Sequence, residues 1–343
     1  MSVTTLSDKV KFIESAFGSG KLARNEKNID IRCPMCAPRD PSKRKLAIRV
    51  DDDRNHCWTC GWRARTLAPL LAKYASREKL QEYITKFLPK ENINKHFLDS
   101  ALDKQNKVQL PNDFRLLATL ENTDPDTCAI KQYLTHRGLS ERDLWYFRIG
   151  VSDEPRWKRR AIVPSFDGEG EVNYFVARTI DKKRNPKYDN PDIDSKLHII
   201  FNEMNVDWTS RLVLCEGSFD MFKCGDNVVP LLGSTLNEES ALFNSILINS
   251  TPIAVALDAD MWFTKTPKIA KKLAEYDVDV TIVDTRSFTD PGSATKDQFK
   301  EALSVAKPFS WFDTFQNKLD HAAGMSLSSH NSYGNATVNH IRK

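Results

Sequence analysis

The sequence has no apolar run of the roughly 18 to 20 residues that a helix needs to cross a bilayer, which excludes a membrane-spanning protein. It also lacks a basic start followed by an apolar stretch, so we expect no secretory signal. Glycine is scarce, with 13 residues in 343, and no collagen-like repeat occurs. The seven cysteines are an odd number in a chain without a signal, so we expect free thiols in a reducing cytoplasm and no disulfide scaffold.

A Walker A phosphate-binding loop is missing as well. The segment from Gly18 to Lys21 looks like part of one. However, Leu22 stands where a serine or threonine is required, and Ser15 stands where the first glycine belongs. We therefore expect no P-loop ATPase motor in this chain.

Positive charge is concentrated in the first third of the chain. Residues 1–110 contain 22 Lys and Arg against 13 Asp and Glu, a balance of +9. The remaining residues contain 28 against 33, a balance of −5, within an overall net charge of +4. A basic surplus of this kind suggests a polyanionic partner such as nucleic acid, although a solvated surface would give the same composition.

Two Cys-x-x-Cys pairs, Cys33 with Cys36 and Cys57 with Cys60, are separated by 20 residues. Each pair can form a tight turn that presents two thiolates, and residues 45–50 between them alternate as a strand does. Four thiolates brought together in this way form a tetrahedral site that suits a structural Zn²⁺ ion. A thioredoxin-like redox motif would account for one pair but not for the second.

Basic and aromatic residues surround these cysteines. Basic side chains interleaved with aromatic rings suit single-stranded nucleic acid, because phosphates pair with the cations and bases stack on the rings. We predict that Trp58 covers the zinc thiolates. The residues predicted to contact DNA are Lys43, Arg44, Lys45, Arg49 and Trp62.

The pattern after about residue 208 predicts an α/β domain. Apolar runs at 211–215, 228–232, 253–257 and 278–283 read as buried strands, and amphipathic helices at 237–247 and 266–276 fit between them. Continuous apolar strands separated by helices indicate a parallel sheet that is covered on both faces. A further helical pattern covers residues 66–88.

Acidic residues follow three of these strands. The carboxyl ends of parallel strands meet at one edge of a sheet, where such folds keep their sites. A cluster of carboxylates there would hold Mg²⁺ or Mn²⁺. Helix capping would equally explain Asp220 and Asp290, but it explains the others poorly. The predicted metal ligands are Glu216, Asp258 and Asp260, with Asp220 and Asp290 as weaker ligands.

The order of these acids resembles the Toprim domain of DnaG-type primases, topoisomerases and some nucleases. The matching motifs are Glu216-Gly217-x-x-Asp220, Gly233-Ser234-Thr235 and Asp258-x-Asp260. Upstream motifs resemble the DnaG-type RNA-polymerase core, namely Tyr133-Leu134-x-x-Arg137-Gly138, Arg160-Ala161-Ile162-Val163-Pro164, Phe175-x-Ala177-Arg178 and Pro186-Lys187-Tyr188. The resemblance covers roughly residues 30–307 and is greatest to primases of the T-even phage type. One departure is Gly292 after Asp290-Pro291, where relatives often carry another acid.

The resemblance implies a zinc-ribbon DNA-binding domain at 1–88, a linker at 89–110 and a basic α+β subdomain at 111–208. A Toprim domain at 209–307 and a partly disordered tail at 308–343 follow. In the implied DNA primase, Glu216, Asp258 and Asp260 are catalytic. The residues implied to bind nucleotide and template are Arg160, Arg178, Lys187 and Lys196.

The implied partners are a single-stranded DNA template, ribonucleoside triphosphates, the RNA primer product and a separate hexameric replicative helicase. For a phage protein, the location would be the cytoplasm of the infected host cell. Two alternatives remain open at this point: a non-catalytic recombination mediator that joins a zinc finger to a Toprim domain, and a Toprim nuclease. A topoisomerase would need a tyrosine nucleophile in a large strand-passage domain, for which the chain has no room.

Overall fold

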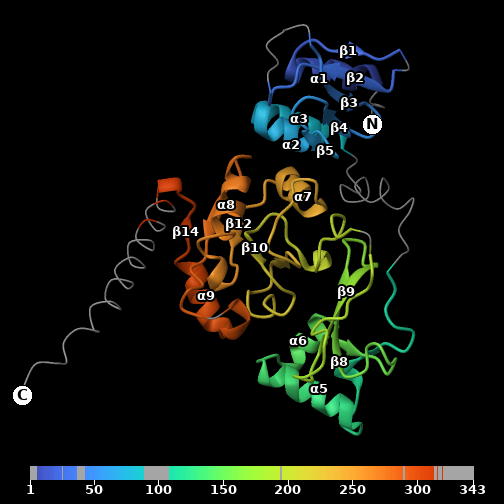
Figure 1. Cartoon of the computed structure of the whole chain (residues 1–343), viewed down its shortest axis with the longest axis vertical. Coiled ribbons are helices and arrows are strands. Elements are labelled where there is room, and N and C mark those ends of the chain that lie inside the picture. The colour runs from blue at the N-terminus through green and yellow to red at the C-terminus, as the bar shows by residue number, and fades with distance from the viewer. Residues whose placement is uncertain are drawn as a thin grey trace, which may run out of the picture.

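The computed structural model describes residues 6–24, 26–36, 43–88, 108–193, 195–288 and 290–312, together with 315 and 319. Three β-sheets and their covering helices form a mixed α/β protein, as the sequence predicts (Figure 1). Residues 89–107 of the predicted linker and 320–343 of the predicted tail lie outside the described residues. None of the helices in the described segments is long and apolar enough to cross a membrane.

The first sheet contains the cysteine pairs, and we call described residues 6–88 the cysteine module. Its antiparallel strands follow chain order: β1 (Lys21–Leu22), β2 (Asn28–Ile31), β3 (Leu46–Arg49), β4 (Asn55–Cys57) and β5 (Arg63–Ala64). Helices α1 (Leu6–Phe17), α2 (Ala68–Tyr74) and α3 (Arg77–Phe87) cover it. The helical pattern predicted at 66–88 is confirmed and forms two helices, because the Ser76 side chain accepts a hydrogen bond from the Lys79 N–H and begins a new helix there.

The second sheet, which we call the parallel sheet, has strand order β11–β10–β12–β13–β14 and is parallel except at β14. Strands β10 (Leu212–Cys215), β11 (Val228–Pro230), β12 (Ile253–Val255) and β13 (Val280–Ile282) are parallel, and β14 (Lys307–Pro308) is antiparallel to β13. Helices α7 (Ala241–Asn249), α8 (Thr266–Ala274) and α9 (Lys296–Ser304) connect them. The four apolar strands and their parallel pairing are confirmed, and the two outer strands, β11 and β14, both end in proline.

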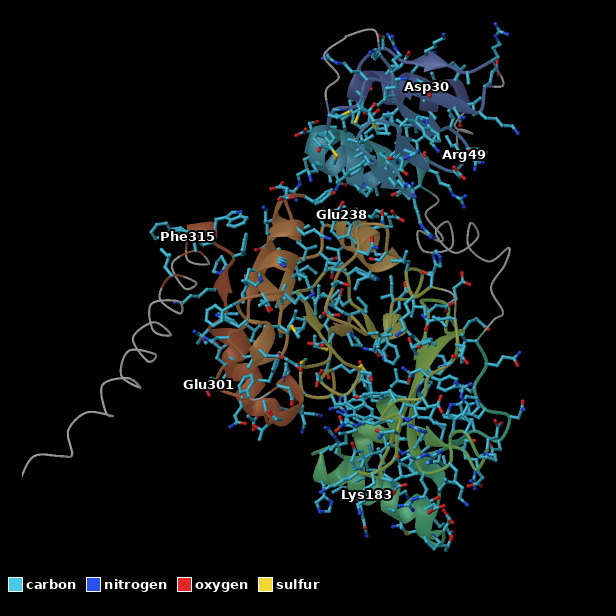
Figure 2. The ribbon with its side chains drawn as sticks, viewed as in Figure 1. Asp30, Arg49, Lys183, Glu238, Glu301 and Phe315 are labelled. Atoms are coloured by element: carbon cyan, nitrogen blue, oxygen red, sulfur yellow. The ribbon has the colours of Figure 1, made fainter. Side chains whose placement is uncertain are left out.

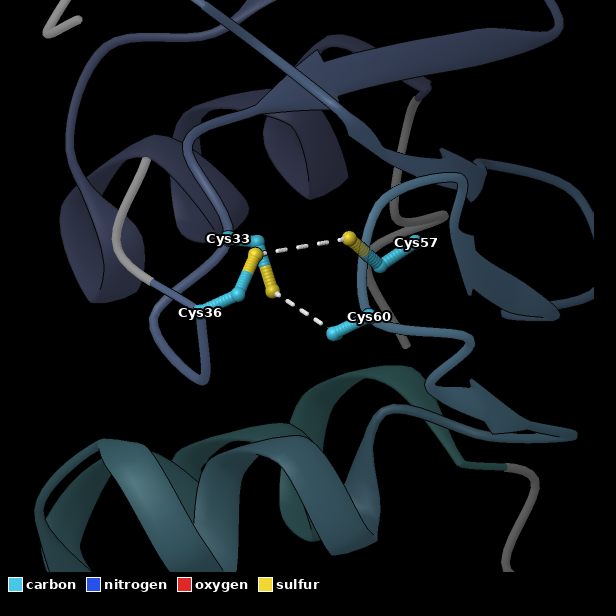
Figure 3. Close-up of side chains that lie close together, drawn as sticks. All are labelled: Cys33, Cys36, Cys57 and Cys60. Atoms are coloured by element: carbon cyan, nitrogen blue, oxygen red, sulfur yellow. Dashed lines mark hydrogen bonds between the residues drawn. The ribbon is translucent and has the colours of Figure 1, made fainter. Parts of the chain in front are cut away.

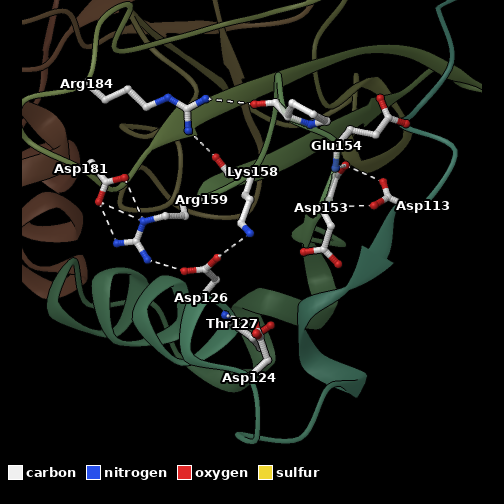
Figure 4. Close-up of polar contacts among 12 residues, drawn as sticks. Asp113, Asp124, Asp126, Thr127, Asp153, Glu154, Lys158, Arg159, Asp181 and Arg184 are labelled. Carbon is white, nitrogen blue, oxygen red and sulfur yellow. Dashed lines mark hydrogen bonds and ion pairs between the residues drawn. The ribbon is translucent and has the colours of Figure 1, made fainter.

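The third sheet is antiparallel, with strands β6 (Arg115–Leu116), β7 (Gly150–Val151), β8 (Arg160–Phe166) and β9 (Val172–Thr179). Helices α5 (Pro125–His136) and α6 (Glu141–Tyr146) precede its two long strands. Several cations in this region bind neighbouring acids. Arg159 forms ion pairs with Asp126 and Asp181, as Figure 4 shows. Arg159 is therefore already paired within the subdomain.

The cysteine module packs against helix α7 of the parallel-sheet domain. One continuous apolar cluster contains α1–α3 residues such as Ile13 and Leu71 together with Phe243 and Ile246 of α7. At this boundary the buried Thr66 hydroxyl donates to Asn244 Oδ1 at 2.9 Å. Figure 1 places the module and helix α5 at opposite ends of the long axis, and Glu238 in Figure 2 faces the module. The third sheet therefore lies far from the cysteines.

A half-buried polar contact also joins the module to the segment before β10. Arg65 Nη1 lies 2.7 Å from Nδ1 of His198. Burial and the Arg65 charge lower the pKa of His198 to about 4. The imidazole is consequently neutral near pH 7 and accepts from the guanidinium instead of repelling it.

Candidate active site and metal centre

The four predicted zinc ligands come together at one end of the cysteine module. Their Sγ atoms all lie within 4.8 Å of one another, with Cys33 to Cys60 and Cys36 to Cys57 at 3.8 Å (Figure 3). The second pair sits in a turn after β4 that closes at Gly61, whose φ of +76° favours glycine. Four thiols at this spacing can hold one tetrahedral zinc ion, so the predicted convergence is confirmed.

The same turn sets the ionisation of the thiols. Burial alone would raise the pKa of Cys57, but N–H groups of Cys60 and Thr59 outweigh it and bring that pKa to about 7. Burial raises the pKa of Cys33 to about 12. Zinc binding at neutral pH must therefore release protons from this cluster.

The two tryptophans beside the second cysteine pair are placed opposite to the prediction. Trp62 is only 6% exposed, and its Nε1–H donates to Asn55 Oδ1 at 2.7 Å. Trp58 is 74% exposed and touches only the His56 ring edge-on among the described aromatic residues. The prediction that Trp58 covers the thiolates is therefore wrong, and burial of Trp62 removes it from the proposed DNA contacts.

The basic residues of the module remain at its surface, and some of them already bind other residues of the module. Lys43 and Lys45 are exposed. Arg44 donates to Ser19, and Arg49 forms ion pairs with Asp51 and Asp52. Exposed pairs of this kind are weak, so a phosphate could replace the carboxylates on Arg49.

Glu216, Asp258 and Asp260 lie beyond the carboxyl ends of β10 and β12, as predicted. Glu216 follows Cys215 directly, and Asp258 precedes the 3₁₀ turn η3 (Ala259–Met261), which contains Asp260. Glu216 Oε2 and Asp258 Oδ1 are buried without a hydrogen-bond partner. Burial and repulsion among the acids raise the pKa of Glu216 and bring that of Asp258 to about 6. Buried oxygens without donors are suited to a cation.

Asp220 and Asp290 lie beside these acids but are partly used as caps. Asp220 Oδ2 accepts from Gly217 N–H at 2.8 Å, and Asp290 forms a capping box with Ser293 on the 3₁₀ turn η4 (Pro291–Ser293). Burial, together with the charges of Asp290 and Glu216, raises the pKa of Asp220 to about 6. Helix capping, the alternative to metal binding, therefore explains part of the role of Asp220 and Asp290.

Gly292 marks where Asp220 and Asp290 approach each other. A Cβ at Gly292 would lie 2.7 Å from Asp220 Oδ1 and 3.0 Å from Asp290 Oδ1. Any side chain there would push the two carboxylates apart. The carboxylates of the whole set are spread more widely than the thiols, because in the described residues only the four cysteines bring three or more ligand atoms within 4.8 Å.

Cations from β9, from the segment after β9 and from the residue that follows α5 face these acids. The Arg178 guanidinium lies 4.7 Å from the Phe219 ring centre and that of Arg137 lies 5.5 Å from it. The charge of Arg178, with burial and Arg137, lowers the pKa of Lys187, while Asp220 and Asp290 act in the opposite direction. Three cations and the acids therefore share one electrostatic environment.

Arg137 was not among the predicted site residues. Its only sequence signal was its place in the Tyr133-Leu134-x-x-Arg137-Gly138 motif, which says nothing about contact with the acids. Arg178 Nε is buried without a partner, which suits an anionic ligand. Lys196 lies apart from this group, with its ammonium 5.7 Å from the Tyr174 ring centre.

Arg160 is placed differently from the prediction that it contacts nucleotide or template. Its side chain is among the largest in the core, at 1% exposure. The guanidinium donates to carbonyl oxygens of Arg156, Ala177, Pro186 and Lys187. This arginine therefore fixes the segment that carries Lys187 and does not itself reach a ligand.

We expect Arg160→Ala to destabilise the protein by about 2–4 kcal/mol, because it empties a large buried site and leaves the Pro186 carbonyl without its donor. Urea unfolding of the purified protein measures this change. The exposed Arg142→Ala is the matched control and should change the unfolding free energy by less than about 0.5 kcal/mol. If Arg160→Ala left the stability unchanged and reduced the affinity for template, Arg160 would contact the template as the sequence predicted.

Comparisons with known proteins find similar chains among the solved structures. The chain is similar to the Aquifex aeolicus primase fragment with zinc-binding and RNA-polymerase domains, at TM-score 0.46 and 18% identity over 90% of this chain and 87% of that one. It is similar to the E. coli primase catalytic core, at TM-score 0.45 and 20% identity over 57% and 78%. A third is the RNA-polymerase domain of Mycobacterium tuberculosis primase DnaG, at TM-score 0.43 and 16% identity over 68% and 85%. No family model and no curated protein matches the sequence.

Proposed function

We propose that this chain is a DNA primase of the DnaG type, nearest to that of T-even phages. It would copy a single-stranded DNA template into short RNA primers from ribonucleoside triphosphates during replication. The observation that carries the proposal is the pair of buried, unpartnered carboxylate oxygens on Glu216 and Asp258, faced by Arg137, Arg178 and Lys187. This arrangement offers ligands for a divalent cation and counter-charges for a triphosphate.

The acids would do two kinds of work. Mg²⁺ or Mn²⁺ held by Glu216, Asp258 and Asp260, with support from Asp220 and Asp290, would supply positive charge for an in-line nucleotidyl transfer. Glu216 would either share in holding the ion or, through Oε2, accept the proton from the attacking 3′-hydroxyl. In the ion-free cluster, burial and repulsion from Asp258 and Asp260 raise the pKa of Glu216, which favours uptake of a proton. Asp258 would help to hold that ion.

The cations would hold the triphosphate. Arg178 and Arg137 lie against the Phe219 ring, which fixes their planes before a ligand arrives. A preset guanidinium loses less conformational freedom when it binds phosphate. Lys187 would neutralise the remaining phosphate charge, and Lys196 would contact the template further along.

The cysteine module would recognise the template. Lys43, Lys45 and Arg49 would pair with phosphates, and Trp58, which is exposed, would take the stacking role that the sequence had given to Trp62. A separate hexameric helicase remains the proposed source of unwound template.

Replacing Trp58 and replacing Trp62 should have different effects, the first on DNA binding and the second on stability. We expect Trp58→Ala to weaken binding of single-stranded DNA by about 1–3 kcal/mol without changing stability, since it removes one stacked base. Trp62→Ala should instead destabilise the module by about 3–5 kcal/mol, because it empties a buried site. Fluorescence anisotropy with labelled DNA and urea unfolding measure the two effects. A Trp58→Ala protein with wild-type DNA affinity would contradict the stacking role.

The experiment that tests the function incubates the purified protein with mixed-sequence single-stranded DNA, labelled ribonucleotides and Mg²⁺. Short RNA products on a sequencing gel are the expected result. Shortened DNA strands in place of RNA would identify the Toprim nuclease alternative. Tight, zinc-dependent DNA binding with no product, even with a hexameric helicase added, would identify the recombination mediator.

A further inference from the structure

A buried lysine behind the acids has no role in the mechanism proposed above. Lys223 is 8% exposed and follows Asp220 by three residues, in the same series of turns after β10. Its ammonium has one hydrogen-bond partner in the described chain, the carbonyl oxygen of Gly138 at 3.4 Å. Among the described residues no carboxylate forms an ion pair with it. A buried ammonium without a counter-charge is unfavourable, so packing alone does not account for this lysine.

Gly138, the partner of Lys223, closes the carboxyl end of helix α5. Arg137 is the C-cap of this helix, and Gly138 follows it with a φ of +75°, which favours glycine. A Cβ at Gly138 would lie 2.3 Å from the Lys223 Nζ atom, so this approach also requires a residue without a side chain. The ammonium therefore lies at the end of α5, where the helix dipole favours a positive charge.

The turns that contain Lys223 hold Arg137 at a second point. The Phe219 ring lies 5.5 Å from the Arg137 guanidinium, while Lys223 binds the backbone of the next residue. The Tyr133 hydroxyl accepts from Arg137 Nε at 3.3 Å. Burial raises the pKa of Asp220, and the Arg137 charge acts in the opposite direction, so the two side chains face each other. The guanidinium is thus fixed relative to the segment that carries Asp220.

A second lysine joins the same corner of the chain to the parallel-sheet domain in a different way. Lys296 of α9 forms an ion pair with Asp143 of α6 at 2.6 Å. Burial and the charge of Lys296 lower the pKa of Lys223, while Asp143 acts in the opposite direction. The three groups therefore lie near one another. Lys296 already has a carboxylate partner that ties this corner to the sheet, which leaves Lys223 to act on Gly138.

We propose that Lys223 is a positioning residue for the triphosphate, because it fixes the guanidinium of Arg137 in front of the acids through the carbonyl oxygen of Gly138. This inference rests on the proposed function and extends it to a residue that acts through Arg137. The charge of Lys223 also adds to the positive potential around Arg137, so its unfavourable burial is partly offset when an anion binds. A neutral side chain at position 223 leaves Arg137 present but less well placed.

The test compares Lys223→Met with the wild-type protein, since methionine keeps the packing of the side chain and removes the ammonium. We expect the dissociation constant for ATP with Mg²⁺, and the nucleotide KM of primer synthesis, to rise by at least about tenfold. The kcat should stay within about twofold, because Arg137 binds the triphosphate equally before and during the reaction. The free energy of unfolding in urea should not fall, since a buried charge is removed. Lys300→Met, at an exposed lysine of α9, is the matched control and should change none of these quantities.

A double-mutant cycle separates positioning from other effects. In an Arg137→Ala protein, Lys223→Met should cause no further rise in the ATP dissociation constant, because the group that Lys223 positions is gone. Unchanged ATP affinity in Lys223→Met, an equal loss with and without Arg137, or a parallel loss of stability would overturn the inference. A wild-type protein that binds ATP but makes no RNA would overturn the proposed function and leave this comparison valid. A wild-type protein that binds no ATP would overturn both.

Discussion

Asp258→Asn is expected to lower primer synthesis by at least about a thousandfold, a loss of roughly 4 kcal/mol of transition-state stabilisation. Asparagine keeps the size of the side chain and removes the charge that would hold the metal ion. Binding of single-stranded DNA should change little, because the module cations lie elsewhere. A single-turnover assay at saturating Mg²⁺ and nucleotide measures the loss.

Asp279→Asn is the matched control for this variant. Asp279 lies just before β13, is exposed and pairs only with Arg211 in the described part of the chain, so its loss should leave the rate unchanged. Wild-type primer synthesis by the Asp258→Asn protein would remove Asp258 from the proposed mechanism.

The same substitution should stabilise the metal-free protein. The pKa of Asp258 is raised to about 6 from an ordinary value of 3.8, so the folded state holds this proton more tightly than the unfolded state does. Its contribution to stability is complete below about pH 4 and is lost as the pH rises through about 6. We therefore expect Asp258→Asn to raise the melting temperature at pH 7 and to change it little at pH 4. An equal change at both pH values would contradict this electrostatic origin.

Removal of zinc is expected to unfold the cysteine module. Zinc binding to a four-thiolate site is worth about 10–16 kcal/mol in small zinc domains, more than a module of this size can gain from its apolar core. Cys57→Ser with Cys60→Ser should therefore abolish the bound zinc and reduce hydrogen-exchange protection in β3 by at least about a thousandfold. Elemental analysis and exchange mass spectrometry measure the two quantities.

The parallel sheet should respond to zinc loss only in part. Its α7 face loses the apolar contacts and the Thr66–Asn244 bond, while its other face stays covered. Nucleotide and metal binding should survive, and initiation on template should not. Cys128→Ser, at a half-buried cysteine outside the cluster, controls for cysteine replacement as such. Full β3 protection without zinc would contradict the structural role of the metal.

The sequence predicted those features that depend on short-range patterns. The four strands after residue 211 are apolar throughout and bounded by polar residues, and their parallel pairing follows from the helices between them. The two Cys-x-x-Cys turns bring their own thiols together locally, and a hairpin brings the pairs together. The placement of Glu216 and Asp258 at strand ends follows from the same reasoning.

Features that depend on distant contacts could not be predicted. Trp58 and Trp62 stand in one turn, and only the packing of α2 onto the sheet decides which is buried. Arg160 reads as a cation for a ligand, yet carbonyls from the segment around Pro186 surround it. Arg137 and Lys187 interact electrostatically although they are about fifty residues apart in the chain. A single sequence contains no pattern that predicts this proximity.

The proline ends of the outer strands have a consequence for assembly. Proline has no N–H to donate, and β14 consists only of Lys307 and Pro308. β11 likewise ends at Pro230 after two residues. Each border of the parallel sheet is therefore short and lacks one donor, which limits the addition of another strand through backbone hydrogen bonds. A partner that binds at these borders would be recognised mainly through side chains.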